Sequence, residues 1–168
     1  MNYLKIGKIV NTHGIKGEIR ILSDFEFKNK VFVKDFKIYI GPSYEEKIIA
    51  SYRHHKEYEM ITMKDLDNIN QVLIYKGQDV YIDRDFLLLK DNEYLLQDLI
   101  GLTIIEGDET LGIIQDIVYN KGNILLSVGG LKEFYIPSHP NFIKEVKLKE
   151  KIVKVENAKD LIIWKLTY

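Results

Sequence analysis

The chain has 168 residues, and its 24 Lys and Arg against 25 Asp and Glu give a formal net charge of −1. A 46% hydrophobic fraction and a 29% charged fraction exclude a disordered chain, and the lack of cysteine excludes disulfides, thiolate metal sites and cysteine nucleophiles. The chain starts without an extended apolar run, and no stretch approaches the roughly 20 apolar residues of a membrane span. We therefore expect no signal peptide and a cytoplasmic location.

The first predicted element is a strand, tight loop and second strand over residues 7–21, GKIVNTHGIKGEIRI. Positions 15, 17, 19 and 21 are apolar or glycine and alternate with charged residues, which predicts a half-buried strand. The loop then carries Thr12, His13 and Gly14, with Lys16 at its exit. Gly14 can adopt a positive φ and has no Cβ, so the backbone can approach an anionic partner closely. From these residues alone, a loop whose histidine caps a backbone group is the simpler interpretation.

The rest of the first half is predicted to be short strands and one helix. Alternating β-branched and aromatic residues indicate strands over residues 36–40, 47–52, 59–63 and 79–82, with a turn at 41–43. A helix is predicted over residues 68–76, with Asp67 as its N-cap and Gly77 as its stop.

The second half repeats this style. Strands are predicted over residues 102–105, 112–119, 124–128, 133–136, 145–148 and 152–155, with a hairpin turn at 120–123. Short strands joined by turns, without parallel crossovers, favour an all-β fold of two small closed barrels with short accessory helices. We expect domains over residues 1–84 and 92–168, joined by residues 85–91, whose apolar run 86–89 packs on one barrel or between both. Trp164 is expected to close the second barrel.

Charge divides unevenly between the halves. Residues 1–84 hold 14 Lys and Arg against 12 Asp and Glu, or +2, and the remainder holds 10 against 13, or −3. An ordinary nucleic-acid binder is strongly basic, so the first half is the better RNA candidate. The second half is slightly acidic, so a basic protein is the more natural binding partner for it.

Other polar residues give weak signals for a metal or for catalysis. His54 and His55 are adjacent, so in an extended segment their side chains face opposite ways and cannot readily hold one ion. His139 fits a surface turn, and helix capping explains Asp65 and Asp67 better than a paired-carboxylate nuclease site. The sequence contains no phosphate-binding loop motif, no glycine fingerprint for dinucleotide binding, no G-x-S-x-G nucleophile elbow and no His-Glu-x-x-His zinc motif. We expect no catalytic residue, metal or cofactor.

Two sets of motifs resemble one family. The His-Gly-Ile-basic-Gly-Glu core at 13–18 resembles the N-terminal motif of the RimM family of ribosome maturation factors. Glu93-Tyr94 followed by Asp98 to Gly101 resembles the start of that family's C-terminal PRC barrel. The pattern continues through residues 111–117, 122–128 and 136–137. Two sets in the right order, spanning nearly the whole chain, are more specific than one glycine-rich match.

The resemblance implies a fold and a function. It implies an N-terminal six-stranded barrel related to translation-factor barrels and a C-terminal PRC barrel. It also implies a non-catalytic factor that binds the immature small (30S) ribosomal subunit and one ribosomal protein of its head, small-subunit protein number nineteen. This factor would assist head assembly and 16S rRNA processing. The implied ribosome-binding residues are those of the N-terminal motif: Thr12, His13, Gly14, Lys16, Gly17 and Arg20.

At the barrel start the chain departs from the family pattern. RimM proteins carry two adjacent aromatic residues there, tied to small-subunit binding, whereas this chain has Tyr94-Leu95. Only Tyr94 carries over as a partner-binding residue. Neighbours in an extended segment face opposite ways, so we expect Leu95 to point inward and Tyr94 to be exposed. The alternatives to an assembly factor are an enzyme, either an RNA-processing nuclease or a small-molecule isomerase or reductase, and a PRC-type scaffold with no RNA role.

Overall fold

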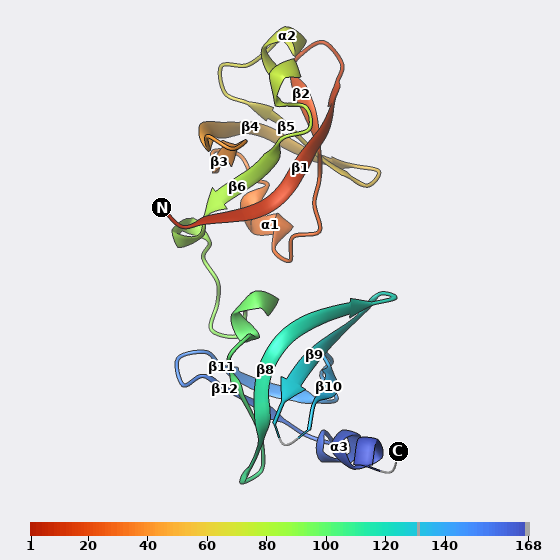
Figure 1. Ribbon diagram of the computed structural model, residues 1–168. Helices are drawn as coiled ribbons and strands as arrows, with labels where there is room; N and C mark the ends of the chain where they lie inside the picture. Colours follow the sequence, from red (N-terminus) through yellow and green to blue (C-terminus); the bar gives the residue numbers. More distant parts are fainter. Residues whose placement is uncertain (131, 167–168) are drawn as a thin grey trace. The chain divides into compact units, whose positions relative to one another are not determined.

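The structure, a computed structural model, describes residues 1–130 and 132–166, without the side chains of 163–166 (Figure 1). Its contacts divide the chain into two compact units, Met1–Leu88 and Leu89–Tyr168. The domain bounds expected at 84 and 92 stay predictions.

In the first unit six antiparallel strands close into a barrel (Figure 1). The strands are β1 (Tyr3–His13), β2 (Glu18–Leu22), β3 (Lys37–Ile40), β4 (Glu45–His55), β5 (Tyr58–Met63) and β6 (Asp79–Asp83). Their order around the barrel is β1-β2-β5-β4-β3-β6, and β6 pairs back onto β1. Closure satisfies the strand edges within the barrel.

Isoleucine at alternate strand positions builds the interior of this barrel. Ile19 and Ile21 on β2 are completely buried, and so is Ile61, which lies opposite Ile19 on β5. Because side chains alternate across a strand, the residues between them face outward, which places Glu18 and Arg20 on the outer surface. The expected half-buried character of this strand is confirmed over residues 18–21.

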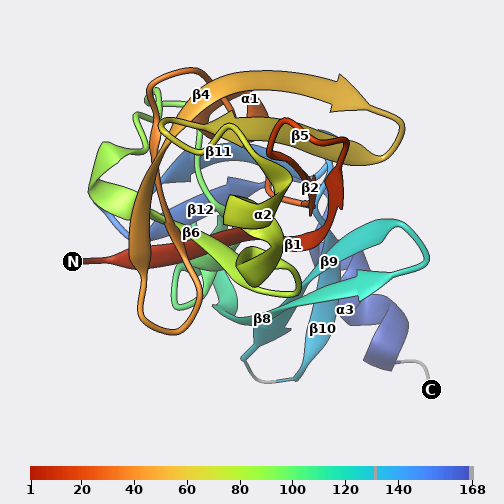
Figure 2. The ribbon, with the colours of Figure 1, turned by 90° about the horizontal axis from the view of Figure 1, so that it is seen from above.

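Short helices complete the first unit: α1 (Lys28–Val31), α2 (Ile69–Val72) and the 3₁₀ turns η1 (Leu73–Tyr75) and η2 (Arg84–Phe86). Figures 1 and 2 together show α2 lying over one end of the barrel. The single helix expected over 68–76 is therefore a turn of α-helix followed by a 3₁₀ turn.

The N-cap of α2 is Asn68, and the prediction of Asp67 was wrong. The Asn70 N–H donates to Asn68 Oδ1 at 2.8 Å, and the Asn68 N–H donates to Gln71 Oε1 at 3.2 Å. This reciprocal capping box needs a glutamine or glutamate three residues after the cap, and only Asn68 has one there.

The second unit is one six-stranded sheet (Figure 1). It begins with the 3₁₀ turn η3 (Leu96–Leu99), and its strands are β7 (Thr103–Glu106), β8 (Glu109–Asn120), β9 (Asn123–Gly129), β10 (Phe134–Pro137), β11 (Ile143–Lys147) and β12 (Ile152–Val155). The strand order is β10-β9-β8-β7-β12-β11, so within the described residues β10 and β11 are edges and the ladder does not close. At the β8–β9 turn Lys121 and Gly122 both have positive φ, which confirms the predicted tight hairpin.

One expectation for the second unit, the absence of parallel crossovers, was wrong. β12 pairs with β7 in parallel, with Val153 opposite Ile104. Four strands separate them in sequence, which gives the chain the length that a parallel return requires. The C-terminal stretch forms a helix, α3 (Lys159–Leu166). The side chain of Trp164 lies outside the described part of the chain.

The connecting segment is only partly packed. Leu87 is buried, whereas Phe86 and Leu88 are exposed. The expectation that the apolar run 86–89 packs is met in full only by Leu87.

Candidate functional site

The turn of the N-terminal motif is shorter than expected. β1 continues to His13 and β2 begins at Glu18, so the turn comprises residues 14–17, and Thr12 and His13 belong to the end of a strand. Ile15 lies in the turn and is 78% exposed, which corrects its placement on the buried face. The alternation begins only where β2 begins to pair, because a turn residue has no ladder partner to fix its direction.

Two glycines fix the path of this turn. Gly14 and Gly17 have φ of +70° and +84°, which residues with a Cβ rarely adopt. Gly17 also lies against the backbone that precedes α2, and the Ile69 N–H donates to the Ile15 carbonyl oxygen at 2.9 Å. The turn is therefore held by its glycines and by the start of α2, while Lys16 at its centre is exposed. The Lys16 side chain makes no ion pair with any described residue.

Arg20 on β2 is positioned by His13 and Tyr58. Its Nη2 atom donates to His13 Nδ1 at 2.7 Å, and the guanidinium carbon lies 5.6 Å from the centre of the Tyr58 ring. Arginine can only donate, so His13 Nδ1 must accept and the ring proton sits on Nε2. The buried Nε of Arg20 has no hydrogen-bond partner among the described residues.

A second arginine reaches the motif from β4. Arg53 Nε and Nη2 donate to the two carboxylate oxygens of Glu18 at 2.9 and 2.7 Å. These hydrogen bonds hold the pKa of Glu18 below its usual range, against the opposing effect of burial, and the nearby His13 and His55 lower it further. The motif glutamate thus ties the β4–β5 hairpin to the motif.

The Glu18–Arg53 pair gives a pH-dependent contribution to stability. Because the pKa of Glu18 is lowered on folding, the contribution is present above the unfolded value near 4.5 and is lost as pH falls through the folded value. Glu18→Gln is expected to lower the free energy of unfolding by roughly 0.5 kcal/mol at pH 7, since Arg53 is half exposed. Denaturant unfolding at pH 7 and pH 3 checks this, and a difference from the parent protein that persists at pH 3 would contradict it.

The two adjacent histidines of the β4–β5 hairpin turn to different partners. His54 Nδ1 lies 3.0 Å from the buried Glu59 carboxylate, whereas the His55 ring centre lies 6.3 Å from that of His13. The pKa of His55 is lowered by burial and then by cationic neighbours, Arg53 first. Cationic side chains, among them Arg53, Lys56 and Arg20, therefore lie near His55 beside the motif.

The C-terminal candidate lies at the start of the second unit. Leu95 is 2% exposed, which confirms its inward orientation. Tyr94 is half-buried, packs against the core of this unit and lines a shallow cleft with residues 143–146 of β11. Tyr94 was expected to be exposed and is half-buried instead, because its side chain packs against the core.

Sequence reasoning missed Arg53, His55 and Tyr58 as neighbours of the motif. Arg53 and Glu18 are 35 residues apart, and only the pairing of β5 with both β2 and β4 brings them together. No local signal in the sequence identifies such a cross-strand contact.

In the described residues no three His, Asp or Glu side chains are placed to hold a metal. The longest helix of that same part has eight residues, too few to cross a membrane.

Comparisons with known proteins give one family for both halves. Residues 4–87 match the RimM N-terminal domain, and residues 96–161 match the RimM PRC barrel domain. The chain is 33% identical to the ribosome maturation factor RimM of Staphylococcus haemolyticus, over 95% of this chain and 98% of that one. It is 33% identical to the protein of the same name from Streptococcus pneumoniae, over 93% and 95%. A solution structure of the N-terminal domain of RimM from Thermus thermophilus covers 53% of this chain and 98% of its own, with 15% identity and a TM-score of 0.46.

Proposed function

The chain belongs to the RimM family of ribosome maturation factors, and on that premise we propose that it binds the immature small ribosomal subunit and assists 16S rRNA processing. The family is non-catalytic. A factor without catalysis can act only through differential affinity, by binding one conformation of the assembling subunit more tightly than others. Release then follows when maturation removes that conformation. The proposed factor acts in the cytoplasm, where the subunit is assembled, and its action needs no cofactor.

The observation that carries the proposal is the ordered cationic surface at the N-terminal motif. Lys16 is exposed on a turn that two glycines and α2 hold in place, and Arg20 is oriented by His13. Pre-oriented cations contact phosphate with little loss of side-chain entropy. We assign ribosome contact to six residues of this motif: Thr12, His13, Gly14, Lys16, Gly17 and Arg20.

The second unit has the opposite charge balance and a different proposed partner. Residues 85–168 carry a formal charge of −3, which suits a basic protein more than RNA. We propose that this unit, residues 92–168, binds a ribosomal protein of the small-subunit head, small-subunit protein number nineteen. Tyr94 would be the aromatic anchor of this contact. Residues 1–84 would then form the RNA-binding domain, with 85–91 as the connection.

Sedimentation of the tagged protein through cell extract tests the proposed function. Co-migration with immature small subunits is the expected result, and it should weaken as salt is raised because phosphate contacts release counterions. Recovery in the soluble fraction alone at every salt concentration would contradict the proposal and favour a scaffold without an RNA role.

Lys16→Glu tests the motif turn. We expect subunit association to weaken about tenfold, because the change replaces a cation with an anion beside phosphate. Thermal stability should change little, since an exposed charge without an ion pair contributes little to folding. Normal association by a folded Lys16→Glu protein would reduce the turn to a structural element.

A further inference from the structure

We propose that the tip of the β4–β5 hairpin, residues 55–57, is a second RNA-binding element that contacts the phosphate backbone next to the N-terminal motif. The inference rests on the proposed function and extends its surface to a segment 35 residues away in sequence.

The hairpin tip lies beside the motif. β5 pairs with β2 on one side and with β4 on the other, and Ile21 lies opposite Glu59, so the β4–β5 turn lies level with the C-terminal end of β2. The Glu18–Arg53 hydrogen bonds and the 6.3 Å separation of the His13 and His55 rings bridge the two segments. One ligand can therefore contact both.

Strand register places two arginines in one row on this flank. Arg20 on β2 and Arg53 on β4 both lie opposite Met60 on β5. Met60 is completely buried although it shares their outward face, which is expected where the aliphatic stems of long side chains flank an apolar residue. Because their stems pack beside Met60, both guanidinium groups are held in defined positions on the barrel surface.

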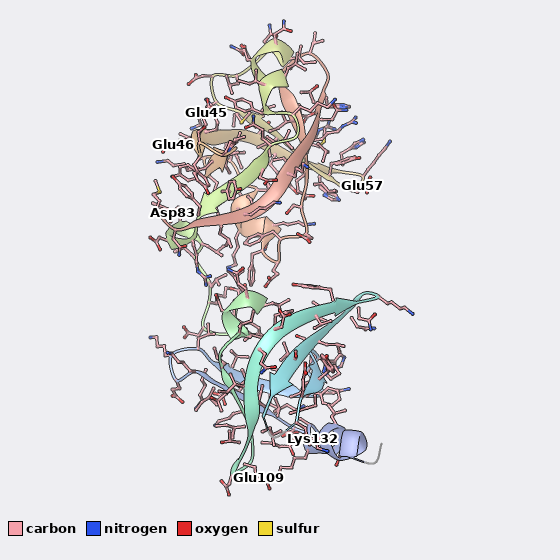
Figure 3. All side chains as sticks on the ribbon, in the orientation of Figure 1. Glu45, Glu46, Glu57, Asp83, Glu109 and Lys132 are labelled. Atoms are coloured by element: carbon pink, nitrogen blue, oxygen red, sulfur yellow. The ribbon has the colours of Figure 1, made fainter. Side chains whose placement is uncertain are left out.

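The hairpin tip adds charge three residues beyond Arg53 along the chain. Lys56 occupies the turn between β4 and β5 with φ of +57°, is exposed, and makes no ion pair with any described residue. The charges of Lys56 and Arg20 both lower the pKa of His55, so both cations lie near this ring. Glu57, the other turn residue, opposes them. Figure 3 shows Glu57 at the outer end of this hairpin.

The ligand that fits this surface is an RNA backbone. The guanidinium groups, the exposed lysines and the Nε2–H of His13 are all donors, which suits phosphate oxygens. An acidic protein would satisfy the same donors. RNA is favoured because the tip is continuous with the motif surface that the proposed function assigns to the subunit.

Lys56→Gly tests the tip without a folding penalty. Glycine adopts a positive φ more readily than lysine, so this protein should fold at least as well as the parent. Affinity for immature small subunits should fall about threefold to tenfold, and the slope of log affinity against log salt should become shallower by roughly 0.7 to 1. A shared loss of affinity and stability would contradict the inference.

Glu57→Gln tests the tip by a gain of affinity, which misfolding cannot imitate. Removing a carboxylate that faces phosphate should strengthen binding about twofold to fivefold. The matched control is Glu46→Gln, the same change at an exposed glutamate near the opposite end of β4. Figure 3 labels the two glutamates on different sides of the first unit. An equal gain in both would show a general charge effect and overturn the local contact.

The pattern across variants separates the two proposals. If Lys16→Glu weakens binding while Lys56→Gly and Glu57→Gln leave it unchanged, the motif contact stands and the hairpin inference fails. If the parent protein does not bind immature subunits, both fail. Repeating the series on protein-free precursor 16S rRNA identifies the ligand: effects of Lys56→Gly and Glu57→Gln that appear on subunits but vanish on the RNA would assign the tip to a ribosomal protein and overturn RNA as its ligand.

Discussion

Gly17→Ala is expected to lower the free energy of unfolding of the first unit by roughly 2 to 4 kcal/mol. A left-handed backbone accounts for about 1 to 2 kcal/mol of this. The remainder comes from contact, because a Cβ on Gly17 would lie 2.8 Å from the Leu66 carbonyl oxygen and 3.2 Å from the Asn68 nitrogen. Both are backbone atoms of the segment that leads into α2, so the clash is relieved only by moving this segment together with the cap of the helix.

Gly14→Ala is the matched control in the same turn. Gly14 also has a positive φ, of +70°, but a Cβ there would meet no atom within 4 Å. We expect a cost of about 1 kcal/mol from the backbone conformation alone. Denaturant and thermal unfolding of the whole chain measure both variants. Equal losses would show that the segment before α2 moves aside freely, and the account of Gly17 as a packing contact would be wrong.

Much of the fold was predictable because it depends on local patterns. Alternating isoleucines marked β2, and residues 120–123 marked the β8–β9 hairpin, since a two-residue turn with positive φ at both positions imposes its own composition. Asn68 as the cap of α2 could also have been found, because Gln71 follows it at the capping-box spacing.

One error in the fold could not be avoided from local sequence. The parallel pairing of β12 with β7 depends on where four intervening strands place the chain, and no pattern within residues 152–155 records it. Local sequence specified the elements, and their long-range partners were set by the assembled sheet.

The candidate site divides in the same way. His13, Gly14 and Lys16 were found because they lie within one short motif. Arg53 and His55 were missed because they join that motif only through the β2–β5–β4 register. Motifs therefore identify the part of a β-barrel surface that comes from one hairpin, and the structure supplies the part that comes from its neighbours.

In the second unit, Leu95→Ala and Tyr94→Ala are expected to separate stability from binding. Leu95 is 2% exposed, so its truncation should lower the free energy of unfolding by roughly 2 to 4 kcal/mol through lost burial and the cavity left behind. Tyr94 is half-buried beside the edge strand β11. Tyr94→Ala should cost about 1 to 2 kcal/mol of binding to the small subunit, as expected for an aromatic anchor, with a smaller loss of stability.

Tyr94→Phe tells whether the ring or the hydroxyl of Tyr94 carries this contact. The phenylalanine keeps the apolar face that covers the core, so stability should stay close to that of the parent protein. If binding is also retained, the ring is the anchor, and if binding falls to the level of Tyr94→Ala, the hydroxyl makes the contact. Affinity must be measured at a temperature where every variant is folded, because partial unfolding of Leu95→Ala would lower its apparent affinity. Should fully folded Leu95→Ala lose binding while Tyr94→Ala loses only stability, Tyr94 would be a core residue and the partner surface would lie elsewhere on this unit.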